Sequence, residues 1–288
     1  MCVHPWLIRC KDEPFLNGSK ELVIPCGRCP ECIKKRQSEW LTRFILESQY
    51  WRKERVGSVC MLGTLTYDDK HYPDSRDRLV KDWQAFLKSL HRKLGVKPRF
   101  YVTTENGSVY GRVHFHFLLF GVPPYDVLEF RNKILKKSWP HGFEHCRVAT
   151  SKDFAYVSKY VTKDVDAFRS NTWRTFESYS KRPSLGFPAL VGQFADSFRL
   201  RGDTKFVDST GFYRSLTRYM SRRLLTDLQR QILLDKYERT MPSPYDSSDI
   251  NQKARASDCW RKYREVCLEA RKKKLGNILK FENLCDNV

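Results

Sequence analysis

From residue 60 onward, stretches of alternating apolar and polar residues take turns with stretches of helical periodicity. Alternation with period 2 is typical of half-buried strands, whereas apolar residues at i, i+3, i+4 and i+7 are typical of amphipathic helices. The pattern predicts strands over 61–67, 99–105, 112–120 and 142–148 and helices over 77–94, 125–137 and 153–166. The order βαββαβ followed by a helix predicts an α+β fold of the split-βαβ type, with an antiparallel sheet and helices on one of its faces.

Two further regions are expected around this core, which we place at residues 57–170. Residues 1–56 contain a cysteine cluster and a helix expected over 33–55. Residues 171–288 form a basic, mainly helical region, with helices expected over 214–239 and 251–279 and a segment rich in helix breakers between them. A chain of 288 residues is long enough for one sizeable catalytic domain with such additions.

The charge balance indicates a polyanionic partner. Lys and Arg number 53 against 33 Asp and Glu, which gives a formal net charge of +20. Nucleic acid is the first candidate, bound with an affinity that falls with salt, and a basic surface that serves only solubility is the alternative. No segment resembles a signal peptide or a membrane span, because the most apolar stretch, 115–122, has only the length of a strand. A cytoplasmic protein without a membrane partner is expected.

Two histidines occupy alternate positions of the strand expected over 112–120. Because side chains alternate across a strand, His114 and His116 project from one face, where two neutral imidazoles can bind a divalent cation. Glu105 ends the preceding strand and would complete a set of two histidines and one carboxylate. Mg²⁺ or Mn²⁺ is the expected ion, since water and phosphate would supply the other ligands. Surface histidines and a solvated glutamate are the alternative.

Two tyrosines and two lysines share one face of the helix expected over 153–166, and this face is expected to point away from the core. They are Tyr156, Lys159, Tyr160 and Lys163. A phenol, with an unperturbed pKa of about 10, attacks phosphorus only with help, which the cation and the lysines would give. Attack would leave a 5′-phosphotyrosyl link and a free 3′-hydroxyl that serves as a primer. Half-buried tyrosines and solvated lysines without a catalytic role are the alternative.

A cysteine cluster precedes the first helix, and its members are spaced as metal ligands: Cys26, Cys29 and Cys32. Because no secretory signal is visible, metal binding explains them better than disulfides. A structural zinc takes four ligands, and Cys2 is the preferred fourth, followed by Cys10 and His4. An iron–sulfur cluster and free thiols are the alternatives.

The motifs together resemble those of the HUH superfamily of replication initiators, relaxases and transposases. The histidine strand is His114-Phe-His116, the upstream strand motif is similar to Leu62-Gly-Thr-Leu-Thr-Tyr67, and Tyr-x-x-Lys occurs twice in overlap. Tyrosines four apart resemble the two-tyrosine class of small single-stranded DNA phages, in which one hydroxyl cleaves and the other resolves the displaced circle. The cysteine run followed by Lys-Lys-Arg narrows the resemblance to gokushovirus replication initiators, over about residues 1–166.

The resemblance implies an HUH endonuclease core and an enzyme that nicks the origin strand for rolling-circle replication and later rejoins the displaced circle. Single-stranded and duplex DNA at the origin would be its partners. No Gly-x-x-x-x-Gly-Lys-[Ser/Thr] motif occurs, so a host helicase and polymerase are expected to open and copy the strands. A non-catalytic, zinc-containing nucleic-acid-binding regulator and a transposase or relaxase of the same superfamily stay as alternative interpretations. The oligomeric state is not predicted.

Overall fold

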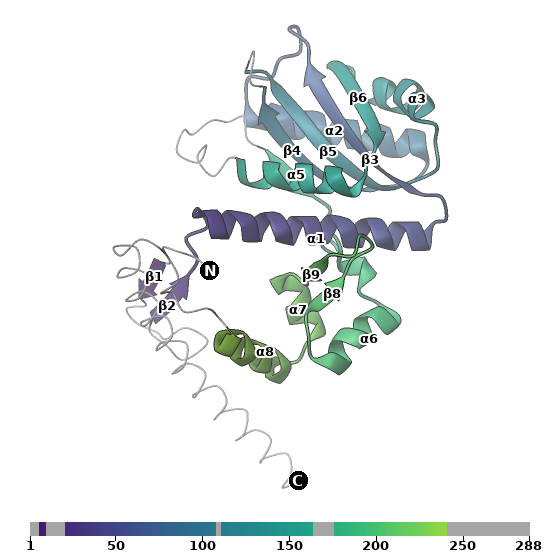
Figure 1. Cartoon of the computed structure of the whole chain (residues 1–288). Helices are drawn as coiled ribbons and strands as arrows, with labels where there is room; N and C mark the ends of the chain where they lie inside the picture. The colour runs from purple at the N-terminus through teal and green to yellow at the C-terminus, as the bar shows by residue number, and fades with distance from the viewer. Residues whose placement is uncertain (1–5, 10–20, 108–110, 164–175, 241–288) are drawn as a thin grey trace, which may run out of the picture. The chain divides into compact units, whose positions relative to one another are not determined.

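The computed structural model describes residues 6–9, 21–107, 111–163 and 176–240. The chain forms two compact units. One unit comprises residues 36–234 and contains the main sheet, and the other comprises residues 1–35 together with 235–288. Figure 1 labels most of the helices and strands.

Five antiparallel strands form the main sheet, in the order β6-β3-β5-β4-β7. They are β3 (Val59–Tyr67), β4 (Arg99–Asn106), β5 (Val113–Val122), β6 (Gly142–Val148) and β7 (Glu177–Tyr179). The first four correspond to the predicted strands, so the α+β class and the antiparallel sheet are confirmed. The sequence does not predict β7, because a strand of three residues carries too little periodicity to be recognised.

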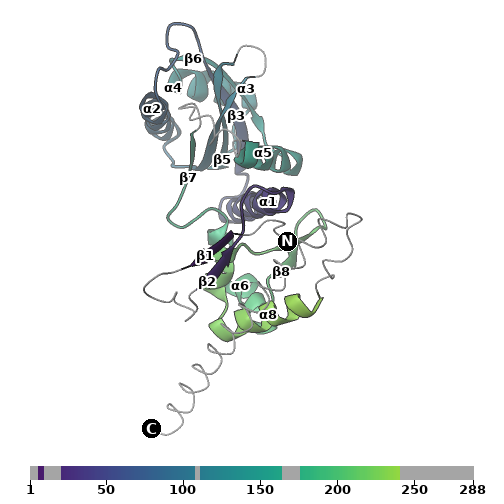
Figure 2. The ribbon, with the colours of Figure 1, turned by 90° about the vertical axis from the view of Figure 1, so that its left-hand side faces the viewer.

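Helices cover both faces of this sheet. Figure 2 views the sheet nearly edge-on and shows α2 on one side and α5 on the other. The first face carries α2 (Arg76–Leu94) and a helical segment made of α3 (Val127–Glu129), the π-helix η1 (Phe130–Leu135) and α4 (Lys136–Ser138). The second face carries α1 (Pro30–Glu54) and α5 (Ser151–Lys163). The prediction of helices on one face only is wrong, because the strands also carry apolar residues on the second face.

The largest apolar core lies between α2 and the first face. α2 begins after the N-cap Ser75, whose side chain accepts a hydrogen bond from the backbone of Arg78, and ends at Gly95 in the left-handed conformation. Its apolar side packs onto β5, and the aromatic residues in contact are Trp83, Phe86, Phe115 and Phe117. These residues lie on the apolar faces that the sequence pattern predicts for the strand over 112–120 and the helix over 77–94.

Gly63 of β3 lies directly under the fully buried ring of Phe117. A Cβ atom at residue 63 would lie 2.1 Å from Cζ of that ring. Gly63→Ala is therefore expected to lower the free energy of unfolding by about 1–3 kcal/mol through overpacking, measured by urea denaturation. In a double-mutant cycle, Phe117→Leu should lower the free energy of unfolding less in the Gly63→Ala background than in the wild type. An unchanged urea midpoint for Gly63→Ala would contradict this packing.

A second apolar cluster lies between α1, α5 and one half of the second face. Phe44 of α1 is fully buried at its centre. It packs against Trp40 of the same helix and against Tyr101, Phe120 and Phe154 of the sheet and α5. The other half of the same face carries polar side chains, so the helices bury the apolar end of the sheet and leave the polar end for the site described below.

The larger unit continues after β7 with short elements. They are η3 (Phe187–Ala189), α6 (Gly192–Arg201), β8 (Lys205–Val207), β9 (Tyr213–Ser215), α7 (Arg218–Leu224) and α8 (Asp227–Thr240), whose last residues belong to the other unit. The prediction of one helix over 214–239 is wrong at both the start and the middle. Leu225 has extended backbone and is buried in the apolar cluster around Phe198, so tertiary packing interrupts the helix. The helix expected over 251–279 lies outside the described residues.

Asp208 holds the turn between β8 and β9 and forms an ion pair with Arg214, 2.6 Å from oxygen to Nε. Burial by itself raises the pKa of Asp208, but hydrogen bonds from Thr210, Arg214 and Phe212 outweigh it and lower the pKa to about 2. Because the folded pKa lies below the unfolded value, about 2 kcal/mol of stability is present above about pH 4 and is lost as the pH falls towards 2. Asp208→Asn should lack this contribution at pH 7 and lose less on acidification.

The measurement for Asp208 is the free energy of unfolding from urea titrations at pH 7 and pH 3. Asp196→Asn, which alters an exposed ion pair on α6, is the matched control and should follow the wild type at both values. Equal pH dependence in Asp208→Asn and the wild type would contradict the assigned role of this carboxylate.

The smaller unit contains a two-stranded antiparallel sheet of β1 (Trp6–Arg9) and β2 (Glu21–Ile24). The cysteine cluster follows β2, and Pro30 begins α1, close to the predicted start of that helix. Within the described part of the chain, no helix combines the length and the apolar character that crossing a bilayer requires.

Candidate functional site

β5 presents His114 and His116 on the second face of the sheet, and β3 orients both rings. The hydroxyl of Thr66 lies 2.9 Å from Nδ1 of His114, and that of Thr64 lies 3.2 Å from Nδ1 of His116. The two threonines repeat the i,i+2 spacing of the histidines and pair with them in register. When each threonine accepts a hydrogen bond from Nδ1, Nε2 is the ring nitrogen that can bind a cation.

Glu105 of β4 lies beside this pair, as the predicted hairpin requires. It pairs in register with His114, and its Oε2 lies 3.0 Å from Nε2 of His116. The side chains of Glu105 and His116 are only 21% and 14% exposed, so water screens the interaction between them poorly. Among the described residues, the cysteine cluster is the only set of three such side chains already gathered closely enough to hold an ion, so His114, His116 and Glu105 would have to move closer together around one.

Tyr160 of α5 lies directly over the imidazole of His116. The two rings are stacked, with centroids 4.8 Å apart and an interplanar angle of 16°. The Tyr160 hydroxyl also hydrogen-bonds to Glu105 and to the hydroxyl of Tyr156. The convergence of the histidine strand and the tyrosine helix, which the sequence could only propose, is therefore present in the fold.

The two tyrosines differ in exposure. Tyr156 is 47% exposed, whereas Tyr160 is only 7% exposed. The prediction that this side of the helix points away from the core is therefore wrong for Tyr160. α5 lies across the sheet. Val157 and Val161 belong to the second apolar cluster. Tyr160, on the neighbouring side of the helix, contacts His116 of β5.

Burial keeps two groups of the site, Tyr160 and His114, in their neutral forms at neutral pH. Burial raises the pKa of Tyr160 well above its ordinary value, and the hydrogen bond with Tyr156 and the charge of Glu105 raise it further. Burial also lowers the pKa of His114, although the charge of Glu105 opposes this shift. A neutral imidazole suits a metal ligand, but a neutral phenol needs activation before it can attack.

The predicted lysines occupy the same helix as the tyrosines. Lys159 is exposed on α5. Lys163 is the last residue of α5, and its side chain lies outside what the structure describes. A role for these two cations in holding phosphate stays a prediction.

Residues of β3 and β6 extend this face beyond the histidine pair, and none of them is among the predicted site residues. Thr64 pairs with His145, and Thr66 pairs with Phe143. The available signal was the Thr-x-Thr spacing within the motif over 62–67, which repeats the His-x-His spacing. Whether these threonines contact the histidines depends on the register between β3 and β5, which no local pattern specifies.

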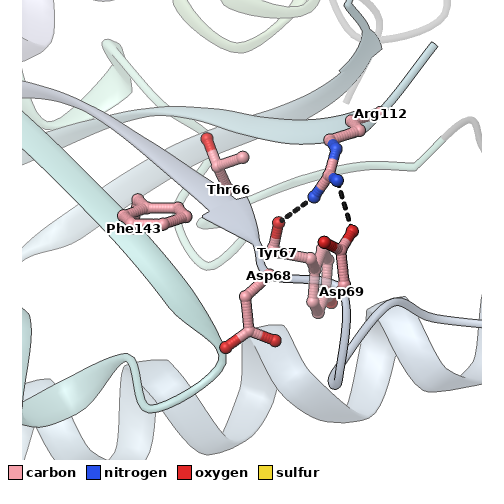
Figure 3. Close-up of a pocket in the computed structure, with 6 residues that line it drawn as sticks. All are labelled: Thr66, Tyr67, Asp68, Asp69, Arg112 and Phe143. Atoms are coloured by element: carbon pink, nitrogen blue, oxygen red, sulfur yellow. Dashed lines mark hydrogen bonds and ion pairs between the residues drawn. The ribbon is translucent and has the colours of Figure 1, made fainter. Parts of the chain in front are cut away.

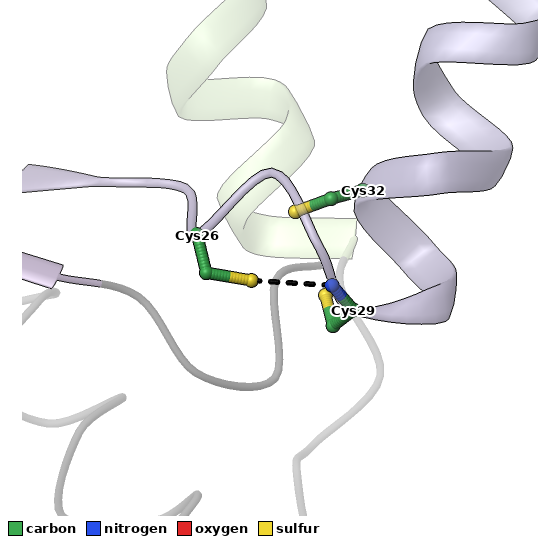
Figure 4. A group of neighbouring side chains, drawn as sticks. All are labelled: Cys26, Cys29 and Cys32. Carbon is green, nitrogen blue, oxygen red and sulfur yellow. Dashed lines mark hydrogen bonds between the residues drawn. The ribbon is translucent and has the colours of Figure 1, made fainter. Parts of the chain in front are cut away.

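The cysteine cluster is a second candidate site, in the smaller unit (Figure 4). The ligand atoms of Cys26, Cys29 and Cys32 lie within 4.8 Å of one another, and the group can hold a metal such as zinc. The sulfur of Cys26 accepts hydrogen bonds from the backbone of Arg28 and Cys29, at 3.4 and 3.3 Å, which favours a thiolate. The candidates for a fourth ligand, Cys2, Cys10 and His4, lie outside the described residues.

Zinc content tests the cysteine cluster directly. The purified wild-type protein is expected to carry about one zinc ion per chain, and Cys29→Ser is expected to lose most of it, because a structural zinc needs its full set of ligands. Cys60→Ala, which alters a buried cysteine of β3, should keep the metal. Metal analysis after gel filtration gives the number. Equal zinc content in both variants would contradict the assignment of the cluster as a metal site.

Comparison with known proteins gives two matches. Residues 60–165 match the model of the family described as Replication-associated protein ORF2. The chain is also 28% identical, over 243 residues, to the Replication-associated protein ORF4 of Chlamydia phage 1. That match covers 75% of this chain and 55% of the relative, so the chain spans about half the length of the curated relative it matches. No solved structure matches significantly.

The matched family segment contains all the residues of the site between the sheet and α5 described above. Over the residues that form most of the sheet and α5, the chain is therefore similar to replication-associated proteins.

Proposed function

We propose that the chain is a replication initiator that nicks single-stranded DNA at an origin and stays covalently attached through a tyrosine. The proposal is supported above all by one arrangement, in which Tyr160 stacks on His116 and shares a hydrogen bond with Glu105. The element order from β3 to β6 supports a split-βαβ core of the HUH type. The matches to replication-associated proteins also support a role in replication.

The donor set of His114, His116 and Glu105 fits Mg²⁺ or Mn²⁺. Two imidazoles and one carboxylate on one side of an ion leave the other positions open for water and phosphate oxygens. The threonine contacts to Nδ1 keep both rings oriented for this purpose. When bound, the ion would polarise the non-bridging oxygens of the scissile phosphate.

The tyrosine performs the covalent step in this proposal. The oxygen of Tyr160 attacks phosphorus, the bond from phosphorus to the 3′ oxygen breaks, and a 5′-phosphotyrosyl link forms. Glu105 is placed to take the phenolic proton, because the two groups are hydrogen-bonded. Glu105 then passes this proton to the departing 3′ oxygen, which leaves as the 3′-hydroxyl, so the proton count is unchanged. Tyr156, hydrogen-bonded to Tyr160, would act when the displaced circle is rejoined.

The remaining parts of the chain would serve this reaction. We propose an organisation into a cysteine-rich segment with zinc over 1–56, the endonuclease core over 57–170 and a basic region over 171–288 that contacts the duplex next to the origin. The net charge of +20 suits such a partner. A host helicase and polymerase in the bacterial cytoplasm would open the duplex and extend the 3′-hydroxyl.

Covalent capture tests the proposal. The protein is incubated with single-stranded oligonucleotides that tile the genome encoding it, with Mn²⁺ or with EDTA, and the products are separated on a denaturing gel. A protein–DNA adduct that forms only with the metal is expected. Specific binding without any adduct across the whole set would favour the non-catalytic regulator instead. Cleavage at transposon ends or at a conjugative transfer origin would favour a transposase or relaxase.

A further inference from the structure

An open pocket of about 400 Å³ lies at the end of β3 (Figure 3). Its lining comprises Thr66, Tyr67, Asp68, Asp69, Arg112 and Phe143. Thr66 is shared with the candidate site, because its hydroxyl hydrogen-bonds to His114. The pocket is therefore a direct extension of the surface that would hold the scissile phosphate.

Phe143 lies in the same row of the sheet as His114. Thr66 pairs with His114 on one side and with Phe143 on the other, and residues directly opposite each other in antiparallel strands share one face. Two strand spacings separate His114 from Phe143, which is about 10 Å. A ligand bound between the histidines and α5 can reach Phe143 by continuing along this row.

The ring of Phe143 is 68% exposed and belongs to none of the apolar clusters formed by the described residues. An exposed aromatic ring beside a polar pocket contributes little to stability, but it offers a flat apolar surface to a ligand. Bases of single-stranded nucleic acid stack on such rings, and the stacking tolerates any base because every base has a π-face.

The polar side of the pocket determines which bases it can bind. Arg112 forms an ion pair with Asp69 and donates a hydrogen bond to the backbone oxygen of Tyr67, so its charge is already compensated (Figure 3). Asp68 adds a second carboxylate, which accepts hydrogen bonds from His71. The carboxylates of Asp68 and Asp69 offer oxygen acceptors, which suit an exocyclic amino group, as carried by cytosine and not by thymine, better than a phosphate group.

We propose that this pocket binds one unpaired base next to the scissile phosphate, with Phe143 as the stacking surface and the two aspartates favouring bases that carry an exocyclic amino group. The proposal rests on the proposed function only in that single-stranded DNA is the ligand. It adds a base-binding subsite and a preference for bases with an exocyclic amino group. The cleavage chemistry requires neither.

Equilibrium binding without cleavage tests this subsite. Labelled dC12 and dT12 are titrated with the full chain in EDTA, and fluorescence anisotropy gives the dissociation constants. Phe143→Ala is expected to weaken dC12 binding about ten- to a hundredfold, as for loss of one stacked base. Phe143→Trp, which keeps an aromatic face, should bind like the wild type. Phe212→Ala removes a ring that is 65% exposed on the β8–β9 turn and is the matched control, with less than a twofold effect expected.

The preference is tested with Asp69→Asn, which should reduce the ratio of dC12 to dT12 affinity while the protein stays folded, because Asp69 is 87% exposed. The subsite is wrong if Phe143→Ala binds like the wild type, or if Phe143→Ala and Phe212→Ala weaken binding equally. Equal dC12 and dT12 affinities in the wild type would overturn the role of the aspartates. These outcomes are separate from the proposed function, since failure to form any adduct in the capture experiment would leave Phe143-dependent binding intact.

Discussion

The Tyr156→Phe, Tyr160→Phe double variant is expected to form no covalent adduct with DNA, a loss of at least about 10³-fold relative to the wild type. Phenylalanine keeps both rings, including the stack on His116, and removes only the two hydroxyls. Without a phenolic oxygen there is no nucleophile for phosphorus. The measurement is the amount of adduct on a denaturing gel after incubation with Mn²⁺, and DNA affinity measured in EDTA should change little.

The single variants separate the roles of the two tyrosines. Tyr160→Phe is expected to reduce the first cleavage more than Tyr156→Phe, because the Tyr160 hydroxyl contacts Glu105. Tyr213→Phe, which alters a tyrosine 81% exposed on β9, is the matched control and should cleave like the wild type. Persistent adduct in the double variant would remove both residues from the mechanism, and the group attached to DNA would then have to be sought elsewhere by mass spectrometry.

The second large effect is expected from His116→Ala, which should weaken Mn²⁺ binding and lower the rate of adduct formation by about 10²–10³-fold. The cation would contribute several kcal/mol to charge stabilisation, and losing a ligand that holds it accounts for an effect of this size. Mn²⁺ affinity is measured by calorimetry on the protein alone, and the rate is measured at saturating oligonucleotide. His91→Ala, on α2 and therefore on the opposite face, should affect neither quantity.

The supporting threonines give a graded version of the same test. Thr64→Val removes the hydroxyl that lies 3.2 Å from Nδ1 of His116, and it is expected to reduce Mn²⁺ affinity by about 10–100-fold, less than loss of the ligand itself. If His116→Ala binds Mn²⁺ as tightly as the wild type, the histidine strand does not hold the ion. Cleavage that proceeds in EDTA at the wild-type rate would lead to the same conclusion.

Local patterns in the sequence were sufficient for the order and type of the core elements. The strand with His114 and His116 could be read because side chains alternate in any extended chain, whatever surrounds it. The helix α2 could be read because its apolar positions repeat with the helical period and breakers limit it. The cysteine cluster follows from spacing alone, since three thiols within seven residues need no distant contact to meet.

Only the tertiary structure decided how these parts meet. The register of β3 against β5 places Thr64 and Thr66 on the imidazoles, and the register of β6 places Phe143 in the same row. The packing of α5 across the sheet turns Tyr160 inward onto His116, against the expectation from helical periodicity. Register and helix docking depend on pairings between segments far apart in the chain, and a local period specifies which residues share a face but not what that face will contact.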